Sequence, residues 1–376
     1  MSSILTDKNK LVEKFDTNLM DIKYVPKGLQ VNKFPDLEVC VYCKDILLYT
    51  WSFMSGNLKI LSPDIFRTEV IELMDRTGLL PLEVEFNSPD PGLHINVRDS
   101  VKKIDLQNIR DFATWFDMIC SNVATHIYLI LDTNILRRLY YSNFLNNIIT
   151  YSRLKDTLKI MIPRLCILEI ENKYNRSSKK EREDMDQKKD NDLKVFTEVI
   201  KGKEKRLGLL SIKEVISIKK NGGLTNPKIS TSLLESFSRA SGTNYADHWI
   251  RKEIMEFNST LHGIEKRNAN GEYHLEKSNG ILVTCDIMNS LVSVSENINT
   301  LYIIRKENPE LKVNSPSLFA SLVYNTAIQF GECTCQIRYH QEETFNVIGM
   351  WKGKTTYDWL TDKILVNDQP TIRSNS

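Results

Sequence analysis

The sequence predicts an α/β fold in which helices flank a mostly parallel sheet. Apolar runs at 127–131, 281–285 and 301–304 have the unbroken hydrophobicity of strands that are covered on both faces. Segments with helical spacing stand between these runs, and strands that alternate with helices are typical of a doubly wound parallel sheet. The first two runs each end directly in an aspartate, which places acidic residues at strand ends.

The composition is that of a globular protein. The chain has 376 residues, of which 41% are hydrophobic and 26% are charged, so global disorder, collagen and a coiled coil are excluded. This length allows two or three domains. Lys and Arg number 50 against 48 Asp and Glu, and the net charge is +2. A uniformly basic coat for nucleic acid is therefore excluded, whereas a local basic face is not.

The sequence favours a cytoplasmic protein. No apolar run is long enough to cross a membrane, and the start of the chain lacks the features of a signal peptide. Seven cysteines are an odd number for a disulfide framework and fit a reducing compartment. Zinc would need the pair Cys40 and Cys43 to combine with Cys333 and Cys335. Because the first pair lies in strand-like sequence, we expect small apolar strand residues instead.

The first third of the chain carries no recognisable chemistry. Residues 1–30 are predicted to be a lead-in or tail, and residues 30–120 a small α+β domain of unknown role. Alternating apolar residues predict its strands, and apolar residues at helical spacing predict its helices. We expect strands at 37–49, 82–86 and 93–97, and helices at 65–75 and 106–120.

Residues 125–310 are predicted to form the α/β domain. A charged insertion at about 171–230 interrupts it and is interpreted as a solvated helix or mobile insertion, with a basic-edged arm over a substrate as the alternative. Residues 311–376 are predicted to be a β-rich extension. The expected elements are a strand at 127–131, a helix at 134–151, a strand at 160–162, helices at 165–173, 231–240 and 245–257, a polar loop at 258–280, strands at 281–285 and 301–304, and a hairpin of 333–339 with 344–351.

Four acidic residues are candidates for a shared site. Asp132 and Asp286 follow apolar strands, whose carboxyl ends face the ligand crevice of an open parallel sheet. Glu169 stands at the head of one predicted helix, and Asp247 lies in the first turn of another. Carboxylates gathered in one crevice would have raised pKa values unless a divalent cation neutralised them. Oxygen ligands favour Mg²⁺ or Mn²⁺ over zinc.

Four segments, taken in chain order, resemble the PIN-domain family of metal-dependent nucleases. The resemblance covers residues 125–310. Each segment holds one of the four acids, and together they imply a PIN-like, Rossmann-like sheet with flanking helices. The segments are 129–136 (LILDTNIL), 162–170 (IPRLCILEI), 244–250 (NYADHWI) and 282–286 (LVTCD).

The resemblance implies a role for each matched residue. The four acids would bind Mg²⁺ or Mn²⁺ and catalyse phosphodiester hydrolysis, most often of single-stranded RNA, without a covalent enzyme intermediate. Thr133 and Asn134 would shape the first turn, and Thr284 would orient the site or a bound water through its hydroxyl. The predicted metal-binding and catalytic residues are Asp132, Glu169, Asp247 and Asp286.

The long spacing around Asp247 departs from compact family members, and Glu235 or Glu253 would be the nearest substitutes for this acid. His248 is interpreted as a surface residue and Glu171 as a solvated one. Basic side chains close to the acids could grip phosphates, although each could equally be a solvated side chain. These are Arg137, Arg138, Arg251 and Lys252.

Two other classes of function compete with an endoribonuclease. One is a catalytically inactive PIN-like module that binds RNA or protein, and retention of all four acids argues against it. The other is an Mg²⁺-dependent phosphatase, but Asn134 stands where a second aspartate would be expected. The sequence has no P-loop and no G-x-S-x-G motif. The size of the flanking regions suggests that they select the substrate or gate the nuclease, as in a stress or defence effector. The N-terminal domain would do the gating and would bind any regulatory ligand or partner, and the chain could form a homodimer.

Overall fold

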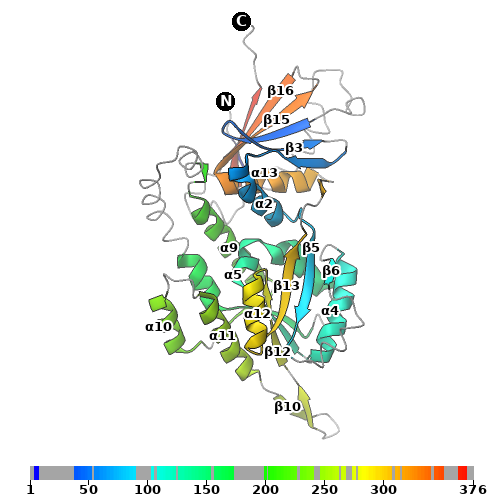
Figure 1. The fold of residues 1–376 in the computed structure, drawn as a ribbon, viewed down its shortest axis with the longest axis vertical. Helices are drawn as coiled ribbons and strands as arrows, with labels where there is room; N and C mark the ends of the chain where they lie inside the picture. Colours follow the sequence, from blue (N-terminus) through cyan, green and yellow to red (C-terminus); the bar gives the residue numbers. More distant parts are fainter. Residues whose placement is uncertain are drawn as a thin grey trace. The chain divides into compact units, whose positions relative to one another are not determined.

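Figure 1 shows the computed structural model, in which the chain divides into two units that are described separately. The parallel-sheet unit comprises Pro81–Lys173 and Ser211–Glu307. The antiparallel-sheet unit comprises Met1–Leu80, Tyr174–Leu210 and Asn308–Ser376. The structure describes residues 4–7, 38–52, 55–89, 103–105, 108–123, 126–153, 156–172, 199–200, 202–226, 229–240, 246–261, 264–267, 273–276, 278–306, 310–313, 316–339, 343–350 and 363–370.

The parallel-sheet unit is built on seven strands in the order β6-β5-β13-β12-β7-β8-β9. The pairs from β13 to β9 are parallel, whereas β5 is antiparallel to both β13 and β6. The predicted α/β fold with a mostly parallel sheet is therefore confirmed. The strands are β5 (Leu82–Asn87), β6 (Lys103–Asp105), β7 (His126–Leu131), β8 (Leu158–Ile162), β9 (Leu224–Thr225), β12 (Ser278–Thr284) and β13 (Asn299–Arg305).

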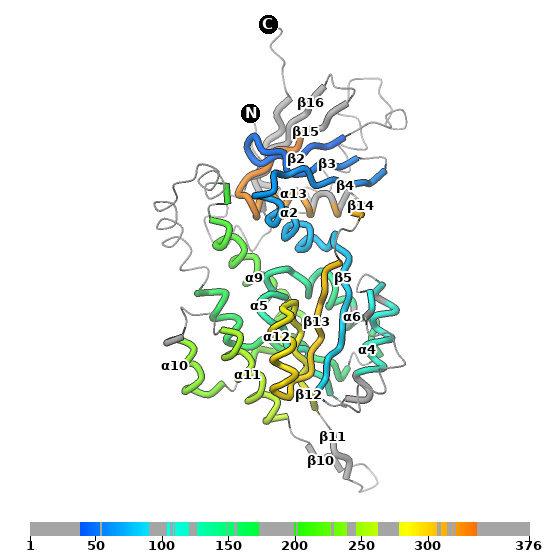
Figure 2. The backbone as a smooth tube through the Cα atoms, in the orientation of Figure 1, coloured from blue at the N-terminus to red at the C-terminus, as the bar shows by residue number. Residues whose placement is uncertain are grey.

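The central strands form because their residues are apolar on both faces. Ile130 and Leu131 of β7 and Leu282 and Val283 of β12 are fully buried, as expected for strands covered on both sides. Figure 2 shows β5 beside β13, although these strands lie far apart in the sequence, and their register pairs Phe86 with Leu301. The sheet thus joins distant parts of the chain.

Helices flank this sheet, with α11 and α12 packed against β12 and α4 packed against β6. The polar loop predicted at 258–280 instead contains the antiparallel strands β10 (Ile264–Arg267) and β11 (Tyr273–Glu276). The helices are α4 (Ile109–Val123), α5 (Thr133–Arg137), the π-helix η2 (Tyr141–Leu145), α6 (Asn146–Tyr151), residues 164–172, α9 (Lys203–Lys220), α10 (Thr231–Ala240), α11 (Ala246–Thr260) and α12 (Ile287–Ser295).

The single helix predicted at 134–151 is divided into α5, η2 and α6. Leu139 adopts a left-handed conformation with a φ of 57°, which ends α5. Beyond it, the main-chain N–H of Ser142 donates to the buried carboxylate of Glu214 at 2.8 Å, and the Ser142 hydroxyl donates to the same carboxylate. In a continuous helix the N–H of Ser142 would donate to a carbonyl of the preceding turn, whereas here it donates to Glu214 from another helix.

The antiparallel-sheet unit contains eight strands in the order β1-β17-β16-β15-β2-β3-β4-β14, and all neighbouring pairs are antiparallel. Helix α13 packs against β15 and against α2. The predicted hairpin corresponds to β15 and β16. The elements are β1 (Ile4–Asp7), β2 (Glu38–Cys43), β3 (Ile46–Ser52), β4 (Asn57–Ile60), α2 (Asp64–Arg76), β14 (Leu311–Lys312), α13 (Pro316–Phe330), β15 (Glu332–Tyr339), β16 (Glu343–Met350) and β17 (Lys363–Pro370).

The cysteine pairs considered for zinc are strand residues of this unit. Cys40 and Cys43 lie on β2, Cys333 and Cys335 lie on β15, and all four are buried free thiols. Burial raises the pKa of Cys43 to about 12, so this thiol stays protonated at neutral pH. These observations agree with the interpretation of the cysteines as small apolar strand residues.

The predicted domain boundaries differ from those of the structure. Residues 30–120 do not form one domain, because the chain passes from one unit to the other between Leu80 and Pro81. Strand β5 pairs with β13 along its whole length, and the side chains of Phe112 and Phe116 on α4 belong to the core of the parallel sheet. The C-terminal extension shares a sheet with residues before 80.

The charged insertion is also divided, since residues up to Leu210 belong to one unit and those from Ser211 to the other. Helix α9 lies in its second half. Residues 173–198, like the strand predicted at 93–97, lie outside the described residues. Across the part of the chain that the structure describes, no helix has the length and apolar character needed to cross a bilayer.

Candidate metal centre

Two of the predicted acids stand at the ends of neighbouring parallel strands. Asp132 follows β7 and caps α5, and its Oδ1 accepts the main-chain N–H of Thr133 at 2.7 Å. Asp286 follows β12 and caps α12, and its Oδ1 accepts the main-chain N–H groups of Met288 at 2.8 Å and Asn289 at 3.1 Å. Because β7 and β12 are parallel neighbours, both acids lie at the same edge of the sheet.

The carboxylate of Asp132 is held by side chains from three elements. Its Oδ2 accepts hydrogen bonds from Thr284 Oγ1 at 2.6 Å, from Asn134 Nδ2 at 2.8 Å and from Asn289 Nδ2 at 3.0 Å. Asp132 is only 1% exposed, so these bonds replace the water that an ionised carboxylate needs. The side chain therefore has one defined orientation.

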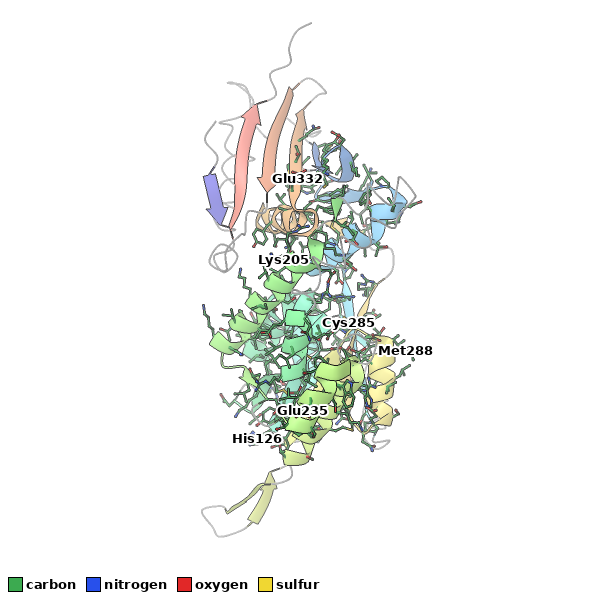
Figure 3. All side chains as sticks on the ribbon, turned by 90° about the vertical axis from the view of Figure 1, so that its left-hand side faces the viewer. His126, Lys205, Glu235, Cys285, Met288 and Glu332 are labelled. Atoms are coloured by element: carbon green, nitrogen blue, oxygen red, sulfur yellow. The ribbon has the colours of Figure 1, made fainter. Side chains whose placement is uncertain are left out.

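Asn134 and Thr284 connect the two acid-bearing turns to each other. Thr284 Oγ1 also accepts from the main-chain N–H of Asp286 at 3.1 Å and from Asn134 Nδ2 at 3.2 Å. Asn134 Oδ1 accepts the main-chain N–H of Cys285 at 3.1 Å. Figure 3 labels Cys285 and Met288, which stand on either side of Asp286 in the sequence. Asn134 and Thr284 thus link the turn after β7 to the turn after β12.

Glu169 and Asp247 bring two further negative charges toward Asp132. Glu169 lies on the helix formed by residues 164–172 and accepts a hydrogen bond from Thr133 Oγ1 at 2.6 Å. Asp247 lies in the first turn of α11, and its charge acts on Asp132 together with that of Glu169. Both side chains are half-buried. The structure thus brings the predicted third acid into the same electrostatic neighbourhood as Asp132.

The pKa of Asp132 reports this concentration of charge. Burial is the largest cause that raises the pKa of the Asp132 carboxyl, and with the negative charges of Asp247 and Glu169 it brings this pKa to about 6. The hydrogen bonds from Thr284 and Asn289 act in the opposite direction and lower it. The largest charges acting on Asp132 are therefore of its own sign.

The donor set fits a hard divalent cation by its chemistry. Every candidate ligand is a carboxylate oxygen, and a cation would relieve the mutual repulsion that raises the pKa of Asp132. Within the described ranges, no group of three or more His, Cys, Asp or Glu side chains is assembled as a complete metal site. The fit therefore rests on the oxygen donors and on their charge. The side chains that could hold the ion are those of Asp132, Glu169, Asp247 and Asp286.

The two proposed substitutes for Asp247 have other positions. Glu253 is fully buried and accepts hydrogen bonds from the main-chain N–H groups of Arg164 at 2.8 Å and Leu165 at 2.9 Å, and from Asn226 Nδ2 at 3.0 Å. It therefore binds the start of the helix that carries Glu169. Glu235 is an exposed residue of α10. Neither residue replaces Asp247 in the site.

The phosphate-binding prediction for Arg251 is wrong. Arg251 is buried on α11, where it pairs with Glu296 at 2.8 Å and donates to Asn289 Oδ1 at 2.9 Å. Lys252 is exposed and Arg137 and Arg138 are half-buried, so these three stay candidates for contact with a substrate.

The prediction of a surface position for His248 is only partly met. This side chain is half-buried, and its ring packs edge-on against Trp249 with 5.1 Å between centroids. Glu171, predicted to be solvated, is exposed.

Sequence reasoning missed Asn289. This buried residue donates its main-chain N–H to Asp286 and its side-chain amide to Asp132, so it touches both strand-end acids. A signal was present in the spacing, since Asn289 stands in the first turn of a helix that Asp286 caps. A polar side chain at this position can point back toward the capping residue.

Comparison with known proteins finds a match to one family model in this part of the chain. The family model described as PIN domain matches residues 129–303, from within β7 to within β13. The matched range contains the four acids and Asn289. No curated protein and no solved structure matches the chain.

Proposed function

We propose, from the premise that residues 129–303 belong to the PIN-domain family, that this protein is a metal-dependent nuclease. PIN domains are generally nucleases and usually bind divalent metal ions. The observation that carries the proposal is the set of like charges around Asp132, a buried carboxylate whose pKa is raised to about 6 by burial and by Asp247 and Glu169. Perturbed carboxylates of this kind cluster at functional sites.

The side chains would divide the work as follows. Asp132 and Asp286 lie at the ends of neighbouring strands, where they would bind Mg²⁺ or Mn²⁺, and Glu169 and Asp247 would add charge from the flanking helices. Thr284 and Asn134 hold the two strand ends in register through the hydrogen bonds described above. A divalent cation supplies an activated water and stabilises charge on the phosphoryl group.

Single-stranded RNA is the substrate that we propose, and cleavage would be internal. Support comes from the resemblance to a family that most often cuts such RNA. The basic residues that we assign to phosphate contacts are Arg137, Arg138 and Lys252. They flank the acids in the sequence, Lys252 is exposed, and the two arginines are only half-buried. The described cysteines are free thiols, which suits our proposal that the protein acts in the cytoplasm.

The first test uses the purified full chain with labelled single-stranded RNA and DNA, in Mn²⁺, Mg²⁺ or EDTA. Asp132→Asn and Glu169→Gln should abolish cutting, because each removes a charge that attracts the cation. Glu171→Gln is the matched control, since it removes an exposed carboxylate from the same helix. Metal-dependent cutting that survives in Asp132→Asn would refute the proposed site.

The same assay separates the competing functions. RNA binding without cutting, in wild-type protein that fails to bind Mn²⁺, would favour an inactive binding module. Release of phosphate from a phosphomonoester without cutting of RNA would favour a phosphatase. Activity that requires an added ligand or partner would support a gated enzyme. We assign such gating to the antiparallel-sheet unit because of its size, and light scattering of the same sample would reveal a homodimer.

A further inference from the structure

Arg251 links two helices of the candidate site without touching an acid of the cluster. It lies on α11, one turn beyond Asp247, and only 8% of it is exposed. Its Nε donates to Glu296 Oε2 at 2.8 Å, and its Nη1 donates to Asn289 Oδ1 at 2.9 Å. Both partners belong to α12, where Asn289 is in the first turn and Glu296 is the C-cap.

Asn289 stands between this guanidinium and Asp132. Its Oδ1 accepts from Arg251, while its Nδ2 donates to Asp132 Oδ2 at 3.0 Å. A guanidinium can only donate and an ionised carboxylate can only accept, so an amide between them has one orientation that satisfies both. The network therefore determines which way the Asn289 amide points.

With this amide interposed, Asp132 makes no direct ion pair with any residue that the structure describes. A guanidinium in contact with Asp132 would compete with a cation for the same carboxylate, because Arg binds carboxylates strongly and never loses its charge. Because Asn289 stands between them, the guanidinium of Arg251 acts on Asp132 only indirectly. The main-chain N–H of Asn289 also donates to Asp286 Oδ1, so the same residue ties both strand-end acids to α12.

We propose that Arg251 is a positioning residue, which orients the Asn289 amide and thereby holds Asp132 and Asp286 in the arrangement that binds a divalent cation. This inference rests on the proposed function, because it assumes that the acids bind a metal. Arg251 does not contact the substrate. Side chains that orient metal ligands in this way typically contribute tenfold to a hundredfold to metal affinity or activity.

The test measures Mn²⁺ binding by calorimetry and, separately, kcat and KM for RNA cleavage, with the full chain. Arg251→Lys keeps the charge but loses the planar fork that reaches Glu296 and Asn289 together. Asn289→Leu keeps the size and removes the amide, and Asn289→Ala serves if the leucine variant fails to fold. Arg206→Lys is the matched control, since Arg206 is a buried arginine of the other unit that donates to the main-chain carbonyls of Ile328 and Gln329.

We expect Arg251→Lys and Asn289→Leu each to weaken Mn²⁺ binding about tenfold and to lower kcat with KM unchanged. The double variant should be no weaker than Asn289→Leu alone, because Arg251 acts through Asn289. A purely structural role would predict additive losses instead. Arg206→Lys should bind Mn²⁺ as tightly as wild type.

The outcomes separate this inference from the proposed function. Unchanged Mn²⁺ binding in either single variant, additive losses in the double variant, or a raised KM for Arg251→Lys would overturn the positioning role alone. Weakened Mn²⁺ binding in protein that cuts no nucleic acid would overturn the nuclease proposal and support the positioning role. Wild-type protein that binds no Mn²⁺ would overturn both.

Discussion

Thr133 Oγ1 donates a hydrogen bond to Glu169 Oε2 at 2.6 Å and so connects the turn after β7 to the helix formed by residues 164–172. Thr133→Val keeps the shape of this buried side chain and removes the hydroxyl. Glu169 would then lose one of the interactions of its carboxylate, the hydrogen bond from the turn that follows Asp132. We expect Mn²⁺ affinity and kcat to fall about tenfold, as measured by calorimetry and RNA cleavage.

Thr133→Ser is the control for that change, because serine retains the hydroxyl and should keep most of the activity. Equal losses in the valine and serine variants would mean that the methyl group, rather than the hydrogen bond to Glu169, is what matters.

The stability of the fold should depend on pH through Asp132. Its pKa is raised from 3.8 to about 6, so the folded protein holds a proton between these values that the unfolded chain has released. Stability from this group is therefore present at low pH and is lost as pH rises through that window, by an amount on the order of 3 kcal/mol.

A cation binds only the ionised carboxylate, and its affinity has the opposite dependence. We expect Mn²⁺ affinity to rise about tenfold between pH 5 and pH 7 and to level off above pH 7. Calorimetric titrations across this range would check the prediction. An affinity that stays constant from pH 5 to pH 7 would show that Asp132 is already ionised at the lower value.

Glu253 should matter for stability and not for catalysis. Glu253→Gln places an amide N–H against one of the donors that now face the carboxylate, from Arg164, Leu165 and Asn226. Loss of a buried hydrogen bond typically costs about 1–3 kcal/mol. Urea denaturation should therefore show a lower free energy of unfolding, while the Mn²⁺ affinity of the folded protein stays unchanged.

The matched control for this change is Glu235→Gln, at an exposed position of α10, which should leave both quantities unchanged. If Glu253→Gln instead lost Mn²⁺ binding at full stability, Glu253 would be a ligand in place of Asp247.

Helix α4 should be essential to the parallel-sheet unit. Phe116 is fully buried in the core of that sheet, so Phe116→Ala should lower the free energy of unfolding by about 3–5 kcal/mol. Met118→Ala on the same helix is the control, since Met118 is 42% exposed. Urea denaturation of the two variants tests the point, and equal, small effects would mean that α4 is dispensable for the sheet.

The strands and three of the acids could be predicted from the sequence because their signals are local. An apolar run that ends in aspartate identifies both the buried strand and its carboxyl end, as for Asp132 after β7 and Asp286 after β12. Parallel pairing then brings such ends together without further information. Glu169 was found from a different local signal, the segment 162–170 that follows β8 and resembles the family's strand–helix element, although it lies in the middle of the observed helix and not at its head.

Other contacts around the site could not be predicted, because they depend on tertiary structure. From the sequence, an arginine near an acidic residue is expected to lie on the surface. Arg251 is instead buried, and it donates hydrogen bonds to Glu296 and Asn289 of a neighbouring helix. In the sequence, Glu253 has no feature that separates it from other helical acids. Its role is defined by the start of another helix, where the main-chain N–H of Leu165 donates to its carboxylate. In both cases the deciding partner lies on a different element.

The domain boundaries were hidden for a similar reason. The chain passes from one unit to the other between Leu80 and Pro81, and the composition of the segment before this point differs little from that of the segment after it. What separates the units is strand pairing between distant segments, such as β5 with β13 and β2 with β15. Local sequence patterns assign adjacent segments to one domain, and they contain no signal for pairing between distant strands.

The position of β7 between β8 and β12 has a consequence for synthesis on the ribosome. A growing chain that ends before Ser278 already contains Asp132, Glu169 and Asp247, but it lacks the strand that covers one edge of β7. It also lacks Thr284 and Asn289, which hold the carboxylate of Asp132. Translation therefore delays assembly of the acidic centre until β12 and the start of α12 have been made.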